Sequence, residues 1–378
     1  MVAADSRESI ASRTLRGAAW AYGSYVGGRV LVLASTALLA RLLAPAEFGL
    51  VALALIFIAL LETVADLGLS QSLVIVRDDV LEHADTVFTA SVLVGTGLAC
   101  ATAAIAPLAA LFFHEPQLVG LLPVLGANFL LRSLGTTHYA LAQRRSEFRS
   151  RTAAELADVA VRGLVGIALA LSGLGAWSLV LGYLAGTAAL TLVLWVRVPW
   201  RPSLRLRRDH LRTLWRFGGA LTGLDVVAAV IANVDYVFVG RVLGPASLGL
   251  YSLGFRIPEL LILNLSVVAG QVLFPAFATL DRDALRRAYL TSLRYTLMVA
   301  LPAAAGLAVL AEPLTLALFG DAWHGAISAT QVLTLYALGV AIGMPAGSAY
   351  KALGRVKVLL LLAIPRAGLL ITALRVFG

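Results

Sequence analysis

The chain has 378 residues, of which 60% are hydrophobic and 13% charged, and its formal net charge is +9. Soluble domains carry about 25% charged residues, so this composition indicates a protein of the lipid bilayer and excludes an ordinary soluble enzyme. A single cysteine, Cys100, excludes a disulfide within the chain.

Eleven apolar runs reach the length of about 20 residues that a membrane-spanning helix needs. In chain order they cover 18–40, 48–73, 86–113, 118–140, 152–172, 174–196, 217–240, 248–276, 286–311, 326–350 and 356–377. The first run is too long for a cleaved signal peptide, so we expect it to remain as the first span.

The basic residues between the spans predict the orientation. With a cytoplasmic N-terminus, the inner segments hold twenty-one of the thirty lysines and arginines, and the outer ones hold only Arg41 and Arg241. Seven of the twenty-one lie in 197–216, which we interpret as a cytoplasmic linker held against anionic lipid headgroups. Topology thus accounts for the positive charge, and no nucleic-acid partner is needed.

The chain contains an internal repeat. Arg41–Leu50 returns 200 positions later as Arg241–Leu250 with six of ten residues identical, among them Pro45/Pro245 and Gly49/Gly249. Matches of Arg, Pro and Gly in register are not expected from hydrophobic composition alone. Duplicated apolar halves are typical of secondary transporters, and six spans per half make the halves parallel repeats.

These patterns predict an all-α polytopic membrane protein built from two parallel bundles of about six helices around a central cavity. We expect an N-terminal six-helix lobe (1–196), a basic cytoplasmic linker (197–216) and a C-terminal lobe (217–378) with five helices. The repeat predicts a twelfth span at about 374–396, beyond Gly378, so the second lobe is expected to be incomplete.

Signatures of enzymes are absent from the sequence. The only lysines, Lys351 and Lys357, are not followed by Ser or Thr, which excludes a phosphate-binding P-loop. The five histidines are scattered and form no zinc-protease pair. We therefore predict a protein that is not an enzyme and that holds no cofactor or metal.

Ionisable residues inside the spans are the candidate functional residues, because each costs about 2.5–3.5 kcal/mol on insertion and usually faces a cavity. Arg162 has Asp158 four residues back, which favours a structural pair, and Arg256 has Glu259 three residues ahead. Three further arginines have no acid at either spacing on their own helix, so their partners must be another helix, water or a ligand: Arg29, Arg132 and Arg366.

The spans hold seven acidic residues, which include Glu155, Asp158 and Glu259. Four others are candidates for ion coupling or for structural pairing: Glu62, Asp66, Asp225 and Asp235. Glu62 and Asp66 are like charges one helical turn apart, as in a coupling-ion site, but Glu62 could equally bridge to Arg29 on the neighbouring helix.

Glycines at four-residue spacing predict close packing between helices. Such pairs occur at Gly182/Gly186 and along Gly339/Gly343/Gly347. Prolines inside the spans, such as Pro107 and Pro258, predict bends.

Several segments together resemble the bacterial polysaccharide-synthesis flippases (Wzx type) of the multidrug/oligosaccharidyl-lipid/polysaccharide exporter superfamily. The segments are Leu15–Trp20, Arg41–Leu50, Asp66–Gly68, Gly173–Val180, Asn233–Arg241, Leu248–Tyr251 and Leu273–Ala276. The resemblance covers most of the chain, although members of that family have twelve or more spans.

This resemblance implies two lobes in a V shape and the movement of an undecaprenyl-diphosphate-linked oligosaccharide from the inner to the outer leaflet of the bacterial cytoplasmic membrane. It also implies a cationic cavity for the diphosphate, with Arg29 and Arg256 on the helices that supply such arginines. Arg suits this role because its planar guanidinium binds phosphate oxygens bidentately.

We therefore predict a flippase that works by alternating access, driven by an H⁺ or Na⁺ gradient or by substrate flow. Its expected partners are the lipid-linked oligosaccharide, membrane lipids, and the glycosyltransferases and polymerase of the same pathway. One alternative is a cation-coupled multidrug exporter of the same superfamily, which should have acids and aromatic residues in its cavity. The other is a membrane glycosyl-polymerase or ligase, against which the short outer connections count.

Overall fold

The computed structural model describes residues 27–65, 73, 79–145, 147–204, 206–207, 229–230 and 232–355. Every regular element in these ranges is a helix. Ten of the eleven predicted spans coincide, wholly or in part, with these helices, and the eleventh, 356–377, lies outside the described residues. The prediction of an all-α membrane protein is confirmed.

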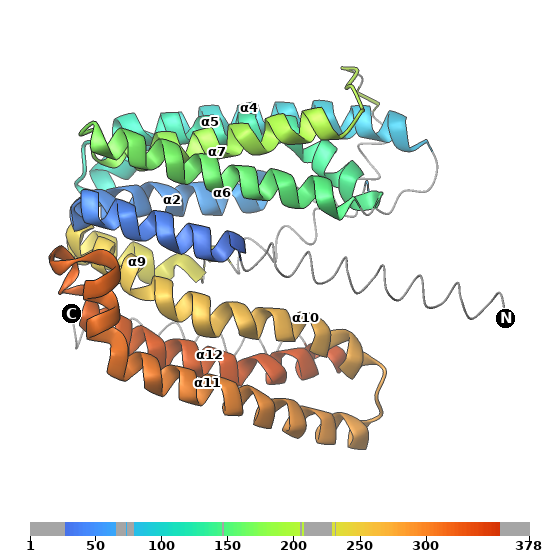
Figure 1. The fold of residues 1–378 in the computed structure, drawn as a ribbon. Helices are drawn as coiled ribbons and strands as arrows, with labels where there is room; N and C mark the ends of the chain where they lie inside the picture. Colours follow the sequence, from blue (N-terminus) through green and yellow to red (C-terminus); the bar gives the residue numbers. More distant parts are fainter. Residues whose placement is uncertain are drawn as a thin grey trace. The chain divides into compact units, whose positions relative to one another are not determined.

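Helices divide between two compact units. The first unit contains Ala54–Val230 and the described part of 1–43, and the second contains Ala44–Leu53 and the described residues after 231. The first unit begins with the helix 27–42 and continues with α2 (Pro45–Ala65), α4 (Val80–Phe113), α5 (Leu118–Arg144), α6 (Phe148–Leu171) and α7 (Ala176–Arg197). The start of α2, up to Leu53, belongs to the second unit. The helices of the first unit run alongside one another in Figure 1.

The second unit continues from a helix that ends at residue 242. Its further elements are α9 (Gly244–Pro258), the π-helical turn η1 (Glu259–Leu263), α10 (Asn264–Ala278), α11 (Arg282–Phe319), the 3₁₀ turn η2 (Asp321–Trp323) and α12 (Ala326–Ala352). Pro258, where a bend is predicted, is the last residue of α9 and directly precedes the π turn.

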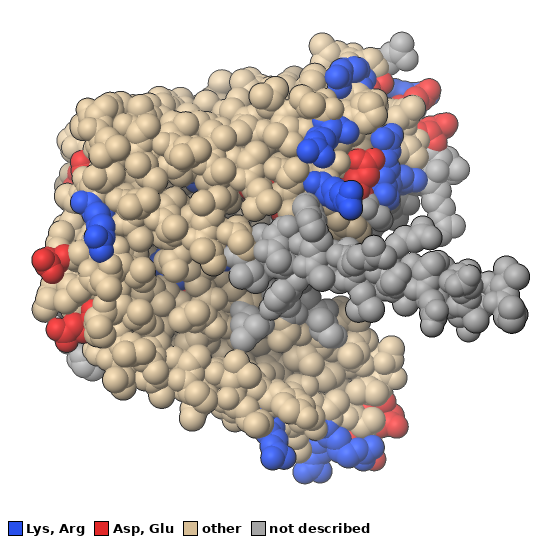
Figure 2. All heavy atoms as spheres, in the orientation of Figure 1, with Lys and Arg blue, Asp and Glu red and all other residues tan. Residues whose placement is uncertain are grey.

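The helices have the length and surface of membrane spans. Seven of those described are long and apolar enough to cross a bilayer. Leu108, Leu111, Leu192 and Val309 have between 66% and 79% of their surface exposed, which water would disfavour and lipid tails would accept. On the face drawn in Figure 2, charged side chains gather near the ends of helices, and the surface between them is almost entirely uncharged.

Small residues bring α6 and α7 close together. A Cβ atom added at Gly182 would lie 2.8 Å from the carbonyl oxygen of Arg162, and one added at Gly186 would lie 2.8 Å from that of Asp158. The predicted packing role of this pair is confirmed. No such close packing is seen at Gly339 and Gly343, where a Cβ atom would meet nothing within 4 Å among the described residues.

The repeated decapeptides contact each other within the second unit. A Cβ atom at Gly49 would overlap the carbonyl oxygen of Pro245, and one at Gly249 would overlap that of Pro45. The contact is therefore reciprocal, and the two backbones approach as closely as glycine alone permits. Trp323, which is fully buried, packs its ring 5.2 Å from Phe48 beside this contact.

The described part of the predicted linker is docked on the first unit. Trp200 is 93% buried in a cluster with Val198 and Phe88, as its relative exposure is 7%. The backbone N–H of Ser203 donates to Asp85 at 3.0 Å, and Arg207 pairs with Glu82. The prediction for the linker considered only its positive charge and its attraction to lipid headgroups. In the structure, the burial of Trp200 and the contacts with Glu82 and Asp85 attach this segment to the first unit.

Candidate functional site

A polar cavity of about 530 Å³ lies among the helices of the first unit. Its walls come from α2, α4, α5, α6 and α7. The described lining residues with ionisable, amide or tyrosine side chains are Glu62, Arg132, Tyr139, Gln143, Glu155, Asp158, Arg162 and Tyr183. Polar groups in such number within an apolar bundle are costly, which marks this cavity as the candidate site. We call it the first-unit cavity.

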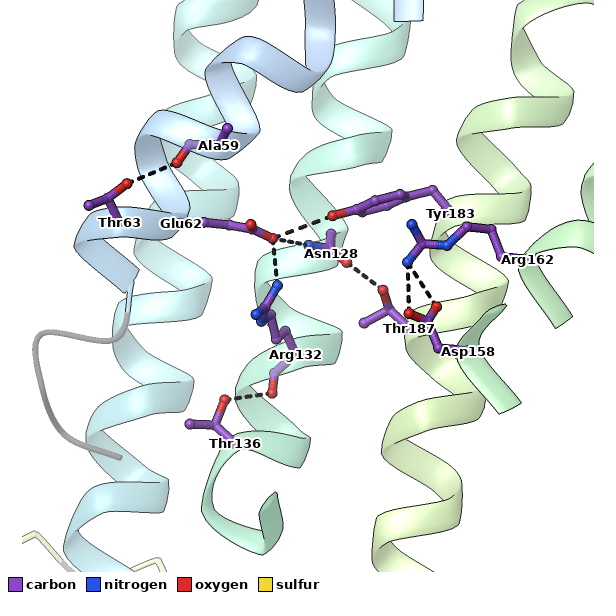
Figure 3. A network of polar contacts seen from close by, with 10 residues as sticks. All are labelled: Ala59, Glu62, Thr63, Asn128, Arg132, Thr136, Asp158, Arg162, Tyr183 and Thr187. Atoms are coloured by element: carbon purple, nitrogen blue, oxygen red, sulfur yellow. Dashed lines mark hydrogen bonds and ion pairs between the residues drawn. The ribbon is translucent and has the colours of Figure 1, made fainter. Parts of the chain in front are cut away.

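Glu62 is the centre of a hydrogen-bonded network (Figure 3). Its Oε1 accepts from Arg132 Nη1 at 2.8 Å, from Asn128 Nδ2 at 3.2 Å and from the Tyr183 hydroxyl at 3.4 Å. Asn128 is fully buried, and its Oδ1 accepts from the Thr187 hydroxyl at 2.8 Å. Donors on α5 and α7 thus fix the direction of a carboxylate carried by α2.

A second ion pair lies on α6. Arg162 Nη2 donates to both carboxylate oxygens of Asp158, at 2.8 and 2.9 Å. The Arg162 guanidinium also lies over the Tyr183 ring, 4.3 Å from its centroid. Tyr183 therefore contacts both charge pairs, with its hydroxyl on Glu62 and its ring on Arg162.

The third carboxylate that lines the cavity, that of Glu155, is linked to an arginine through a tyrosine hydroxyl. The Tyr139 hydroxyl donates to Glu155 Oε1 at 2.8 Å and accepts from Arg151 Nη2 at 2.7 Å. Arg151 also packs over the Tyr139 ring at 4.6 Å. Each of the three lining carboxylates is thus associated with an arginine, two directly and Glu155 through Tyr139.

The structure brings two of the predicted site residues together, Arg132 and Glu62. The partner of Arg132 comes from another helix, which is one of the three alternatives that its own helix left open, and Glu62 thus pairs with Arg132. Asp158 and Arg162 form the pair that their four-residue spacing predicts. They also line the cavity, which the structural reading did not anticipate.

Other predicted site residues lie elsewhere. Arg29 is half-buried on the helix 27–42 and is not among the described residues that line the cavity. Arg256 and Asp235 belong to the second unit. Three candidates lie outside the described residues: Asp66, Asp225 and Arg366.

Sequence reasoning missed the uncharged members of the network. Asn128 and Thr187 carry no charge, and a search for ionisable residues passes over them. A signal was present, since Asn128 stands one turn before Arg132 and Tyr183 one turn before Thr187. Polar residues four apart on an apolar helix share a face, and that face here meets the cavity.

The second unit holds a more closed polar cluster. Asp235 has a relative exposure of 7% and accepts a 2.6 Å hydrogen bond from the Tyr251 hydroxyl. The Tyr236 ring meets the Tyr251 ring edge-on at 5.3 Å. One turn further along, Arg256 Nη1 pairs with Glu259 at 3.2 Å on the same helical stretch.

Comparison with known proteins gives a consistent result. A family model described as "Polysaccharide biosynthesis protein" matches residues 38–328. The "Lipopolysaccharide biosynthesis protein WzxC" of Escherichia coli (strain K12) is 28% identical over 360 residues, covering 93% of this chain and 72% of that protein. The "Succinoglycan biosynthesis transport protein ExoT" of Rhizobium meliloti (strain 1021) is 29% identical over 340 residues, covering 89% and 68%.

Among solved structures, the inward closed conformation of "Lipid II flippase MurJ" superposes with a TM-score of 0.71. The match is 16% identical and covers 91% of this chain and 78% of that one. At this identity the likeness concerns the fold alone, and it confirms a transporter fold.

Proposed function

The chain belongs to the family described as "Polysaccharide biosynthesis protein", and from this premise we propose that it flips a lipid-linked oligosaccharide across the bacterial cytoplasmic membrane. The substrate we propose is an undecaprenyl-diphosphate-linked oligosaccharide, moved from the inner to the outer leaflet by alternating access. The enzymes that build and polymerise the saccharide are its expected partners. The observation that carries the proposal is the first-unit cavity, a polar space inside a bundle with an apolar surface.

The physical problem of flipping lies in the head group. Each methylene left in lipid contributes about 0.8 kcal/mol, so a long polyprenyl tail stays in the bilayer throughout. The sugar-diphosphate head cannot cross hydrocarbon without partners for its polar groups. A cavity rich in hydrogen-bonding side chains at the depth of the spans supplies such partners.

Arginines are our candidates for holding the diphosphate. Arg29, Arg256 and Arg366 are proposed for this role on their position in the spans. Arg132 lines the cavity with 59% of its side chain exposed, and we propose that it acts through the carboxylate of Glu62. Arg132 shares its guanidinium with Glu62, so a cation bound to that carboxylate would release it. This competition would let an H⁺ or Na⁺ gradient drive the cycle.

Reconstitution into liposomes tests the proposal. The assay uses a polyprenyl-diphosphate oligosaccharide with a fluorescent sugar, and chemical quenching from outside reports the leaflet. Wild-type protein should expose the label to the quencher. Thr136→Trp places a large side chain in the cavity and should lower the rate of flipping at least tenfold. Leu164→Trp, at a position 70% exposed on α6, is the matched control and should flip normally. Equal rates with and without protein would overturn the proposal.

One rival has a specific observation in its favour. Three carboxylates line the cavity, as a cation-coupled drug exporter would require. Two results together would favour drug export over flipping. The protein would export a cationic dye in a way that Glu62→Gln abolishes, and it would not flip the lipid-linked saccharide. A change in polymer length with intact translocation would instead point to the glycosyl-polymerase alternative.

A further inference from the structure

We propose that the first-unit cavity is a glycan subsite, which binds uncharged sugar units of the head group while the diphosphate is held outside it. The inference rests on the proposed function and narrows it in two ways. It names the part of the substrate that this cavity takes, and it assigns Arg132 to positioning Glu62 rather than to binding phosphate.

The charges of the cavity argue against an anionic ligand. Among the described lining residues, the carboxylates Glu62, Glu155 and Asp158 outnumber the guanidiniums Arg132 and Arg162. Both guanidiniums are already engaged at 2.8 Å with Glu62 and Asp158, respectively. A diphosphate entering here would meet guanidiniums whose charges are already balanced by carboxylates, and it would lie at short range from those carboxylates.

Arg151 adds a third positive charge beside the cavity, but it does not give the cavity a net positive charge. It reaches Glu155 only through the Tyr139 hydroxyl, and its guanidinium lies against the Tyr139 ring. Counted together, the three acids and three arginines cancel. A neutral site that is dense in polar groups favours a neutral ligand that is dense in polar groups.

The groups available match the hydroxyls of a sugar. Carboxylates accept hydrogen bonds from hydroxyls, and the Gln143 amide can donate and accept at once. Among the described residues, all three donors to Glu62 use Oε1, which leaves Oε2 as an acceptor on a side chain that is 26% exposed. The half-buried ring of Tyr183 lines the same space and offers apolar surface to the C–H face of a sugar.

The site is organised before any ligand arrives. Asn128 is fully buried and is held at both ends of its amide, by Glu62 and by Thr187, so the direction of the Glu62 carboxylate is set by the core of the unit. Preorganised polar groups lose little entropy on binding. The volume of about 530 Å³ lies within the range of pockets for small ligands, so the site takes sugar units and not a long chain.

A binding experiment separates the two parts of the head group. The protein in lipid nanodiscs is titrated with a free neutral tetrasaccharide and, separately, with inorganic pyrophosphate, and thermal unfolding is followed. Wild-type protein should be stabilised by the saccharide at millimolar concentration. Thr136→Trp should lose that response and keep any response to pyrophosphate, and Leu164→Trp should respond as wild type does. No stabilisation by the saccharide, or loss of the pyrophosphate response alone in Thr136→Trp, would overturn the subsite.

A transport experiment tests the preference for uncharged sugars. Two lipid-linked substrates with the same tail and diphosphate are compared in liposomes, one ending in hexoses and the other in hexuronic acids. The neutral head should be flipped at least tenfold faster, and Glu155→Gln should narrow that ratio by leaving the cavity with a net positive charge. Equal flipping of both heads by wild type overturns the subsite and leaves the proposed function standing. Flipping of neither overturns both.

Discussion

The two units share a repeated scaffold but hold different polar groups. In the first unit, Glu62 and Arg132 meet across helices at an open cavity, whereas in the second unit Asp235 is buried under Tyr251. At the offset of 200, Glu62 corresponds to Ile262 and Asp235 to Ser35. The duplicated backbone contact at Gly49 and Gly249 thus persists while the polar residues have diverged. The residues that form the repeated backbone contact are therefore different from those that form the polar groups of each unit.

The largest expected effect on stability comes from substitutions at the repeated backbone contact. Gly49→Ala and Gly249→Ala each place a methyl group against a proline carbonyl oxygen of the other repeat. Overpacking of this kind costs about 1–3 kcal/mol or more, so both variants should unfold at clearly lower temperature in detergent. The two should be affected alike, because the contact is reciprocal.

Gly339→Ala is the matched control for this pair. Among the residues that the structure describes, none comes within 4 Å of a Cβ atom at Gly339, and Ala is better than Gly by about 1 kcal/mol inside a helix. The control should therefore unfold at the same or slightly higher temperature. If Gly49→Ala behaved like Gly339→Ala, the reciprocal contact would not be part of the scaffold.

A matched pair of Tyr→Phe changes sharpens the contrast between closed and open polar groups. Tyr251→Phe removes a 2.6 Å hydrogen bond from the buried Asp235 and should cost about 1–3 kcal/mol, with flipping unchanged. Tyr183→Phe removes a longer bond of 3.4 Å to Glu62 at the cavity and should cost less stability but slow flipping. Thermal unfolding and the liposome assay measure the two effects. Equal loss of stability in both would erase the distinction between the units.

The Glu62–Arg132 pair should contribute little to stability in spite of its short distance. Arg132 has 59% of its side chain exposed, and exposed pairs contribute about 0.2–1 kcal/mol. A double-mutant cycle with Glu62→Gln and Arg132→Gln measures the coupling directly. A coupling of several kcal/mol would mean that the pair is effectively buried and not poised for exchange.

The sequence predicted the helices because span length and hydropathy depend on neighbouring residues only. The resemblance to polysaccharide-synthesis flippases is likewise confirmed by the family match over 38–328. The offset of the repeat is not constant, however. α5 begins at Leu118 and α12 at Ala326, 208 positions later, so these two helix starts are eight residues further apart than the offset of the decapeptides.

The site was predictable only where partners share a helix. Asp158 and Arg162 followed from their four-residue spacing, but the partner of Arg132 depends on α2 lying beside α5, which no local pattern encodes. Asn128 was missed because its importance comes from burial and from Thr187 on another helix. Packing between helices decides these contacts, and a single sequence does not display it.

The smallest expected change in stability accompanies the sharpest test of the second unit. Arg256 and Glu259 are an i,i+3 pair at 3.2 Å with side chains 39% and 34% exposed, so Arg256→Ala should cost only about 0.2–0.5 kcal/mol. If Arg256 holds the diphosphate, flipping should nevertheless fall at least tenfold, and Arg256→Lys should recover part of it, since Lys keeps the charge but loses the bidentate fork. Wild-type flipping by Arg256→Ala would remove this residue from phosphate binding. The Arg256–Glu259 pair would then be a structural pair, in contrast to the Glu62–Arg132 pair at the cavity of the first unit.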